Sequence, residues 1–442
     1  MDDRALILSC GGSPEPLIYC IKEYEPDFIY FLCSYNSKGI AEDIVNELSI
    51  PEDKYSLKMV KNHESLDESF AKSREIIKEL QKNYSQVHID FTGGTKPMVS
   101  GLVLAAIGEK CTYTYVGSID EKARDKKGLG IVKSGFEKIK EQKDPYDVYA
   151  VMEFEKGMEF FDKYQFSAAK TNFIEASKKL ESNNLREIAK LYIRIVHIYD
   201  KWDKFDNLTD EHKTLNNELS LILNDICNSL NLKNNLNHSF ISQIKNNIEF
   251  LKLKISKRGK IKPSDAPYYL PDLLNNSLRR IEEGKYDDAV ARLYRSIELI
   301  AQVKLTDKKI INVHVLESNK QFKIDRRELN SVPNVNFGKL FNIHEYKNSQ
   351  SSKDKTFKVG LKSSYRILDC LGSSFAKEYL EDEDIGKNLD SRNASILAHG
   401  LKTINKKTAD NLYNQVFKYA KKAFPELEKY MEMSKFPKFS TD

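Results

Sequence analysis

The sequence predicts an α/β domain at the N-terminus, followed by all-α domains through the rest of the 442 residues. Two observations lead to this fold class. Strand-like apolar runs alternate with helical patterns over the first ~140 residues, which is typical of a doubly wound, mostly parallel sheet. From residue 147 onward, apolar residues recur at helical spacing with few breaks, as they do in helical bundles.

Six segments of the first region have the length and apolar content of strands. They are Ala5–Ser9, Phe28–Cys33, Tyr55–Val60, the run that ends at Asp90, Cys111–Val116 and Gly128–Lys133. Helices are expected between them over residues 16–24, 38–48, 64–83 and 97–109. In an open parallel sheet, ligands bind outside the carboxyl ends of the strands, so the loops at that edge are the first place to look for a site.

The remaining chain is predicted to form two helical blocks. The first covers residues 147–257 and includes a segment at 154–181 that suits either a single tetratricopeptide-like hairpin or a generic helical bundle. After a linker at 258–267, the second block contains an amphipathic helix over Tyr286–Leu305. Residues 306–360 are charged and rich in Asn and Ser, so they are expected to be an irregular insertion.

Composition narrows the class of protein. The net charge is +5, which permits a nucleic-acid partner without requiring one. The apolar runs are too short to cross a bilayer, and the first residues, Met-Asp-Asp-Arg, do not resemble a signal peptide. The six cysteines form no Cys-x-x-Cys pair and the histidines lack metal-ligand spacing, so we expect reduced thiols and no metal or cofactor. These features predict a cytoplasmic protein with no membrane partner.

The segment Asp90–Met98 reads Asp-Phe-Thr-Gly-Gly-Thr-Lys-Pro-Met and lies between a predicted strand and a predicted helix. Its glycines let the backbone approach a ligand closely, and the N-terminus of the new helix directs free N–H groups at it. Loops 11–16 and 34–38 lie at the same edge of the predicted sheet. The candidate ligand-binding residues are Gly11, Gly12, Ser13, Pro14, Ser34, Thr92, Gly93, Gly94, Thr95 and Lys96.

This pattern differs from the common nucleotide-binding motifs. A P-loop requires Ser or Thr after its lysine, whereas Pro97 follows Lys96, and the chain has no Gly-x-Gly-x-x-Gly. ATP hydrolysis and dinucleotide binding are therefore disfavoured. A tight strand-to-helix turn that simply needs glycine is the alternative interpretation of this segment.

A second group of polar residues lies near the C-terminus. Arg392 and His399 are seven positions apart, so in a continuous helix they share one face at a separation of ~10 Å. Asp390 or Ser391 is placed to cap the start of such a helix.

These residue types suit cleavage of RNA without a metal ion. A histidine with a pKa near neutrality can move protons to or from the reacting oxygens while the neighbouring 2′-hydroxyl attacks the phosphate. A guanidinium can hold the phosphate and stabilise its developing charge, and Asn393 can orient either partner. One helix supplies a single Arg–His pair, but an isologous dimer would bring two pairs together.

Both groups of residues together resemble the CRISPR-associated type III accessory ribonucleases, which join a CARF sensor domain to a HEPN nuclease domain. In the sensor part, the resemblance rests on Gly11–Pro16, Phe31–Ser34 and Asp90–Met98. In the nuclease part, it rests on Arg392, Asn393 and His399, which match the family's Arg-x(4–6)-His pattern, and on the helix Asp288–Glu298.

The resemblance covers essentially the whole chain. It implies a Rossmann-like CARF domain at 1–142, a helical linker domain at 147–257 and a HEPN ribonuclease domain at 268–442. Similar proteins are homodimers that bind cyclic tetra- or hexa-adenylate and then cut single-stranded RNA, leaving a 2′,3′-cyclic phosphate. By resemblance, Arg392, Asn393 and His399 are the catalytic residues. No stable DNA complex is expected.

Two other functions are compatible with the same residues. In the first, the sensor domain degrades its own cyclic oligoadenylate, with Ser13, Thr95 or Lys96 positioning a ring 2′-hydroxyl. In the second, the chain is a nucleotide-sensing regulator whose C-terminal bundle has no catalytic activity. The presence of Arg392, Asn393 and His399 argues against the second.

Overall fold

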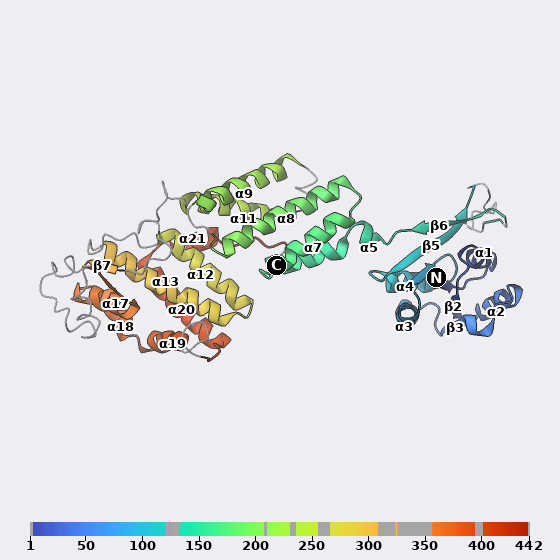
Figure 1. Cartoon of the computed structure of the whole chain (residues 1–442), viewed down its shortest axis with the longest axis horizontal. Helices are drawn as coiled ribbons and strands as arrows, with labels where there is room; N and C mark the ends of the chain where they lie inside the picture. The colour runs from blue at the N-terminus through green and yellow to red at the C-terminus, as the bar shows by residue number, and fades with distance from the viewer. Residues whose placement is uncertain are drawn as a thin grey trace. The chain divides into compact units, whose positions relative to one another are not determined.

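The computed structural model describes residues 3–120, 123, 132–133, 135–206, 210–229, 236–254, 266–307, 323–325, 356–393 and 401–440. The chain divides into two compact units (Figure 1). The first contains residues 1–153 and 178–185, and the second contains residues 154–177 and 186–442.

The first unit is built on a six-stranded sheet with the order β3-β2-β1-β4-β5-β6. The strands are β1 (Arg4–Ser9), β2 (Phe28–Ser34), β3 (Tyr55–Val60), β4 (Gln86–Asp90), β5 (Cys111–Ser118) and β6 (Glu137–Gln142). The helices are α1 (Glu15–Tyr24), α2 (Lys38–Glu47), α3 (Leu66–Asn83), α4 (Lys96–Ala106) and α5 (Pro145–Val148), with a 3-10 turn at Glu52–Lys54. The first five strands pair in parallel, which confirms the doubly wound, mostly parallel sheet.

Both faces of this sheet are covered, because alternate residues of a strand point to opposite sides. In β1, Ala5 and Ile7 pack with apolar residues of α3 and α4. Leu6 and Leu8 face the other way and pack with residues of α1 and α2. The continuous apolar run of this strand is therefore the sequence signature of a strand with helices on both sides.

The sixth strand differs from the sequence-based expectation. The strand was expected at Gly128–Lys133, of which only residues 132 and 133 are described. In the structure, β6 lies at Glu137–Gln142 and pairs antiparallel with β5. Its sequence, Glu-Lys-Ile-Lys-Glu-Gln, contains a single apolar residue, Ile139, because it is an edge strand. Hydrophobic content therefore could not identify it.

The second unit is mainly helical. Its helices are α6 (Val151–Asp162, which begins in the first unit), α7 (Phe166–Lys179), α8 (Asn183–Asp203), α9 (Asp210–Asn228), α11 (His238–Lys254), α12 (Ala266–Glu282), α13 (Tyr286–Asp307), α17 (Leu361–Cys370), α18 (Ser374–Glu381), α19 (Glu383–Asn393), α20 (Lys406–Ala423) and α21 (Leu427–Met433). Two short strands, β7 (Lys323–Asp325) and β8 (Thr356–Lys358), pair antiparallel. These elements confirm the predicted helical architecture.

Helix α13 is the central helix of the C-terminal core. The face predicted from its sequence is fully buried: Ala289, Leu293, Ile297 and Ile300. Residues of α12, α17 and α20 complete the same hydrophobic cluster. The periodicity of this segment therefore predicted both the helix and its buried side.

The segment predicted at 154–181 does form a helical hairpin. Helices α6 and α7 pack closely at Gly157, where a Cβ would lie 2.5 Å from the ring of Phe173. Trp202, expected to serve packing, is fully buried on α8. The predicted boundary between a middle domain and the C-terminal domain falls on residues 258–267, mostly outside the described residues, so it stays a prediction.

Two expectations from composition concern the whole chain. Buried reduced thiols were expected at Cys10, Cys33 and Cys111. Cys10 and Cys33 are buried free thiols, as is Cys20, whereas Cys111 is only half-buried. Among the helices in the described ranges, none has the length and apolar character needed to span a membrane.

Candidate ligand-binding and nuclease sites

The candidate ligand site lies where the strand order of the first unit reverses. Strand β1 pairs with β2 on one side and with β4 on the other. The loops that follow β1 and β4 therefore leave the sheet side by side at its carboxyl edge, which is the usual ligand position in such sheets. The structure brings Gly11 together with Gly93 and Gly94, as the sequence predicted.

Glycine is required where these two loops touch. A Cβ on Gly11 would lie 2.6 Å from the backbone nitrogen of Gly94, and a Cβ on Gly93 would lie 2.6 Å from the carbonyl oxygen of Ser9. Gly94 also has a φ of +94°, a conformation that L residues rarely adopt. By contrast, a Cβ on Gly12 would meet nothing within 4 Å. Gly11, Gly93 and Gly94 thus allow backbone to pack directly against backbone, and Gly12 stays open to solvent.

Buried polar groups hold the loop after β4. Ser9 Oγ donates a hydrogen bond to the carbonyl oxygen of Gly93. The hydroxyl of Thr92 donates to Asp90 Oδ2 at 2.9 Å, and its oxygen accepts the amide hydrogen of Val116 at 2.7 Å. Burial raises the pKa of Asp90 to about 6, against the opposing effect of its hydrogen bonds from Thr92. Thr92 therefore supports the loop, as do Ser9 and Asp90, which are not among the predicted ligand-binding residues.

Thr95 and Lys96 begin helix α4. The Thr95 hydroxyl accepts the amide hydrogen of Met98 at 3.4 Å and donates to the carbonyl oxygen of His63 at 2.5 Å. The loop after β3 therefore joins the site through His63, a contact that no pattern in the sequence predicts. Lys96 is exposed at the first turn of α4. Its ammonium group therefore adds to the partial positive charge at the N-terminus of this helix.

The other two predicted loops reach the same edge. Ser34 and Ser37 close a turn after β2, in which Ser34 N donates to Ser37 Oγ at 2.9 Å and Ser37 N donates to Ser34 Oγ at 3.2 Å. This turn leaves Tyr35 67% exposed. After β1, Pro14 occupies the N-cap position of α1, and Ser13 is half-buried. Lys96, Ser13 and the open backbone at Gly12 are thus the groups best placed to contact a ligand.

The candidate nuclease residues are at the end of helix α19. This helix begins at Glu383 and ends, in the described residues, at Asn393, so Arg392 and Asn393 form its last turn. His399 lies outside the described residues. The expectation that Asp390 or Ser391 caps the helix start was wrong, because the helix begins seven residues before Asp390.

Contacts along its length fix the position of α19. Asp382 caps the helix by accepting the amide hydrogen of Ile385 at 3.1 Å, and Tyr419 OH donates to the other oxygen of Asp382 at 2.8 Å. Asn388 donates from its side chain to Gln415 Oε1 at 2.9 Å. Since Tyr419 and Gln415 both belong to α20, this helix anchors α19 at two places. The start of the helix and its middle are therefore held before the chain reaches Arg392.

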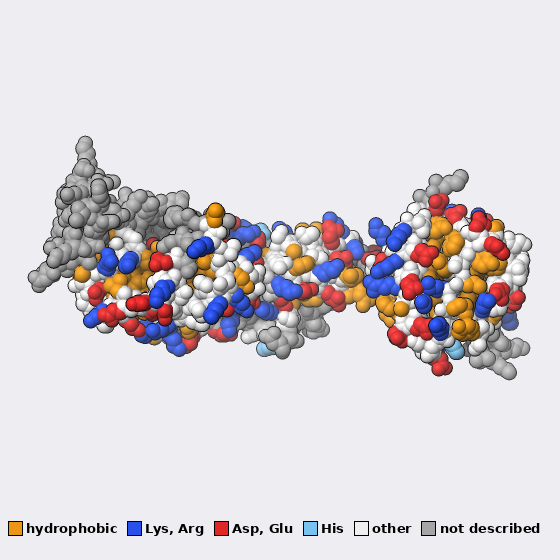
Figure 2. Space-filling model, turned by 90° about the horizontal axis from the view of Figure 1, so that it is seen from below, with side chains coloured by type: hydrophobic (Ala, Val, Ile, Leu, Met, Phe, Trp, Pro, Cys, Tyr) orange, Lys and Arg blue, Asp and Glu red, His pale blue; other side chains and the backbone are white. Residues whose placement is uncertain are grey.

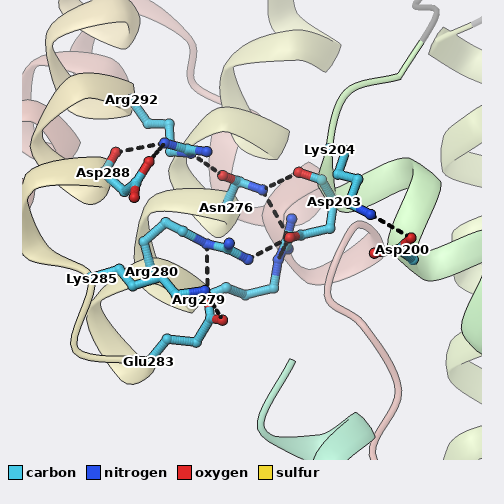
Figure 3. Close-up of polar contacts among 10 residues, drawn as sticks. All are labelled: Asp200, Asp203, Lys204, Asn276, Arg279, Arg280, Glu283, Lys285, Asp288 and Arg292. Carbon is cyan, nitrogen blue, oxygen red and sulfur yellow. Dashed lines mark hydrogen bonds and ion pairs between the residues drawn. The ribbon is translucent and has the colours of Figure 1, made fainter. Parts of the chain in front are cut away.

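A buried charged network links three helices of the second unit (Figure 3). Asp203, at the end of α8, accepts hydrogen bonds from Arg279 Nε at 2.7 Å and Asn276 Nδ2 at 2.9 Å, and it pairs with Arg280. From α13, Arg292 donates to Asn276 and pairs with Asp288 at 2.8 Å. This network joins α8 to α12 and α13, so it connects the middle helices to the C-terminal core.

Within the described residues, no group of three or more His, Cys, Asp and Glu side chains is arranged to hold a metal ion. The candidate residues offer other chemistry. The carboxyl edge of the sheet in the first unit presents glycine backbone, hydroxyls and Lys96, which suit phosphates. Arg392 and Asn393 suit phosphate binding at a separate place in the chain.

Comparisons with known proteins identify the C-terminal part of the chain. Residues 258–423 match the family model described as the Csm6 HEPN domain. Among solved structures, Enterococcus italicus Csm6 bound to cyclic hexa-2'-fluoro-hexa-dAMP is 12% identical, with a TM-score of 0.49; the match covers 98% of this chain and 100% of that chain. Can2 from Sulfobacillus thermosulfidooxidans in complex with cyclic tetra-adenylate is 13% identical, with a TM-score of 0.22, over 73% of this chain and 72% of that chain. No curated protein matches the chain.

The fold and the family match define a protein in which a Rossmann-like α/β domain precedes a HEPN helical domain. Residues 258–423 of the chain are therefore similar to the HEPN domain of Csm6. The predicted enzyme class, a HEPN ribonuclease, is supported by the same match.

Proposed function

We propose that this protein is an endoribonuclease of type III CRISPR antiviral defence that cyclic oligoadenylate activates and that cuts single-stranded RNA without a metal ion. The observation that carries the proposal is the Csm6 HEPN match over residues 258–423, which includes Arg392, Asn393 and His399. The proposed activator is cyclic tetra- or hexa-adenylate, bound at the carboxyl edge of the sheet in the first unit.

The sensor site suits a cyclic oligoadenylate. Each ring phosphate is an anion, and the site offers the exposed Lys96, the N-terminus of α4 and the open backbone at Gly12. A ring of adenylates repeats its phosphates around a symmetry axis. Two copies of this edge, related by a two-fold axis, would therefore present matching groups to opposite sides of one ring.

The proposed reaction uses the 2′-hydroxyl of the RNA itself. The 2′-oxygen forms a bond to phosphorus, the bond to the 5′-oxygen breaks, and a 2′,3′-cyclic phosphate is left. His399 moves protons between these oxygens, and Arg392 binds the phosphate as its charge develops. Asn393 supports both residues by hydrogen bonding.

A homodimer completes the proposed active site. One α19 helix supplies one Arg392 and one His399, whereas an isologous interface places two such pairs together. Figure 2 shows hydrophobic side chains gathered on one face of the first unit, while basic and acidic side chains are mixed over the visible surface of the second. Exposed apolar side chains of the first unit, including Leu66, Leu104 and Ile119, support association through this unit.

An RNA cleavage assay with a panel of cyclic oligoadenylates, each with and without chelator, tests the proposal. We expect one ring size to activate cleavage of single-stranded RNA, with full activity in chelator. Arg392→Ala and His399→Ala should each abolish cleavage and leave activator binding within about two-fold, since the two sites are separate. Cleavage that survives both substitutions would disprove the site, and a strict need for Mg²⁺ would indicate a different chemistry.

A further inference from the structure

Residues Ser434–Ser440, near the C-terminus, form a segment that we call the C-terminal strap. It follows α21 and has no helix or strand, yet much of it is buried. Ser434 is fully buried, Phe436 is 8% exposed and Pro437 is also buried. Irregular chain of this kind normally lies on the surface, so burial indicates that the rest of the protein binds it specifically.

Two aromatic side chains of the strap enter the helical core. The ring of Phe439 lies 4.6 Å from Phe240, 4.8 Å from Tyr192 and 5.1 Å from Phe161, measured between centroids. These partners come from α11, α8 and α6. Phe439 therefore completes an aromatic cluster to which the hairpin of α6 and α7 contributes.

Phe436, three residues before Phe439, is the second aromatic residue of the strap that packs against the helices. Its ring lies 4.8 Å from Tyr199 and 5.2 Å from Trp202, both on α8. On another side, the guanidinium of Arg279 stacks 3.8 Å from the ring centroid. Arg279 also donates to Asp203 at the end of α8, so one side chain of α12 contacts both the strap and the charged network of Figure 3.

Side chains of the middle helices bind the strap backbone. Asp162, at the end of α6, accepts the amide hydrogens of Phe439 at 2.7 Å and Ser440 at 2.8 Å, one on each carboxylate oxygen. The buried Asn247 donates to the carbonyl oxygens of Met433 and Lys435, both at 2.7 Å. Charged and buried hydrogen bonds of this kind are among the stronger ones in proteins.

The helices that bind the strap also extend into the sensor unit. Residues 151–153 of α6, 178–179 of α7 and 183–185 of α8 are assigned to the first unit, and the remainder of each helix is assigned to the second. These three helices therefore connect the two units along the chain. At the strap's other end, the chain is covalently continuous with α21, and Asn275 of α12 donates to Met431 O at 2.7 Å and Ser434 Oγ at 2.8 Å.

We propose that the C-terminal strap couples the sensor to the nuclease, by binding helices α6, α7 and α8 at one end and the HEPN helices α12 and α21 at the other. Without the strap, these middle helices lose the aromatic and carboxylate contacts that connect them to the end of the HEPN domain. Activator binding then biases the nuclease less strongly, because only the network around Asp203 still joins α8 to α12. This inference rests on the proposed function, because it concerns how activator binding reaches the HEPN domain.

The test uses the full-length protein with Phe439→Ala, and with Ser440→Ala as the matched control, since Ser440 is exposed and keeps its amide bond to Asp162. Activator binding and RNA cleavage, with and without activator, are measured for each. We expect Phe439→Ala to bind activator within about two-fold of the parent and to lose stimulation by about ten-fold, the ratio that corresponds to 1.4 kcal/mol of coupling. Unstimulated cleavage should stay the same, and Ser440→Ala should behave as the parent.

A second experiment covers the case in which Phe439→Ala does not fold. Phe439→Leu in the full-length chain keeps an apolar side chain of similar size and removes only the aromatic contacts of Phe439. This variant should bind activator as the parent does and lose part of the stimulation. Full stimulation of Phe439→Leu, or of a folded Phe439→Ala variant, would overturn the proposal. If the parent itself shows no activated cleavage, the proposed function fails instead.

Discussion

The hydroxyl of Thr92 donates a hydrogen bond to the buried carboxylate of Asp90 at 2.9 Å, and Thr92 N donates to the other oxygen of the same carboxylate at 3.1 Å. Asp90 is the last residue of β4, and Thr92 is the second residue of the loop that follows it. The carboxylate therefore fixes the direction in which the chain leaves the sheet toward Gly93 and Gly94. Its protonation state should affect the stability of the whole unit.

The first prediction concerns pH. Burial raises the pKa of Asp90 from 3.8 to about 6, so the folded state binds a proton more tightly than the unfolded state does. The stability that this group contributes is thus fully present below pH 3.8 and is lost as pH rises through about 6. Asp90→Asn keeps the shape without the charge, so its free energy of unfolding relative to the parent should rise by up to about 3 kcal/mol between pH 4 and 7. Urea unfolding at four pH values measures this, and a constant difference between the two proteins would contradict it.

The second prediction separates two neighbouring glycines. Gly11→Ala places a methyl group 2.6 Å from the nitrogen of Gly94, a backbone atom that cannot move away easily. We expect this variant to lose about 1–3 kcal/mol of stability and to bind cyclic oligoadenylate more weakly. Gly12→Ala is the matched control for stability, since its Cβ would meet nothing within 4 Å. Equal thermal stability of the two variants would show that the loops are not packed as described.

The third prediction concerns Lys96. Because its side chain is exposed, Lys96→Ala should leave the free energy of unfolding within about 0.5 kcal/mol of the parent. Loss of the ammonium group should weaken activator binding by about ten-fold, with a smaller dependence on salt than the parent shows. Lys78→Ala, an exposed lysine of α3, is the control and should bind normally. Calorimetric titration at two salt concentrations distinguishes these outcomes, and unchanged affinity in Lys96→Ala would remove Lys96 from the site.

Much of the fold of the first unit could be predicted, because its central strands are continuous apolar runs. A strand covered on both faces, such as β1, has a continuous apolar run from Ala5 to Leu8, and the glycines at 11 and 93–94 mark places where backbone packs against backbone. The edge strand β6 has charged residues instead, so hydrophobic pattern gave no signal for it. The hydrogen bond from Thr95 to His63 could not be predicted either, because His63 accepts it through its carbonyl oxygen, which every residue has.

In the C-terminal part, too, some features could be predicted from the sequence and others could not. The buried face of α13 follows from its 3.6-residue periodicity. The start of α19 does not follow from periodicity, because its cap, Asp382, is held by Tyr419, 37 residues away in the chain. The burial of the strap could not be predicted either. Phe436 and Phe439 belong to no periodic apolar pattern, and Phe161, a partner of Phe439, lies 278 residues away in the chain. Long-range contacts of single side chains leave no local pattern in a sequence.

The last prediction concerns the buried pair of Lys254 and Asp272. Both side chains are fully buried, and Lys254 Nζ bonds to the Asp272 oxygen that also accepts from Trp202 Nε1 at 2.9 Å. Lys254→Met leaves a buried carboxylate without its counter-charge, so we expect a loss of about 3–5 kcal/mol. Lys252→Met, an exposed position on the same helix, should change stability by less than about 0.5 kcal/mol.

A double variant tests whether the loss comes from the uncompensated charge. Lys254→Met with Asp272→Asn has no net charge at the site, and the Asn oxygen can still accept from Trp202. This double variant should recover most of the lost stability, because desolvation penalises the ionised form of the carboxyl group far more than a neutral amide. Trp202 is the single tryptophan of the chain, so its fluorescence during urea unfolding reports directly on this region. If the double variant is no more stable than Lys254→Met, the pair contributes through packing of the lysine stem rather than through charge.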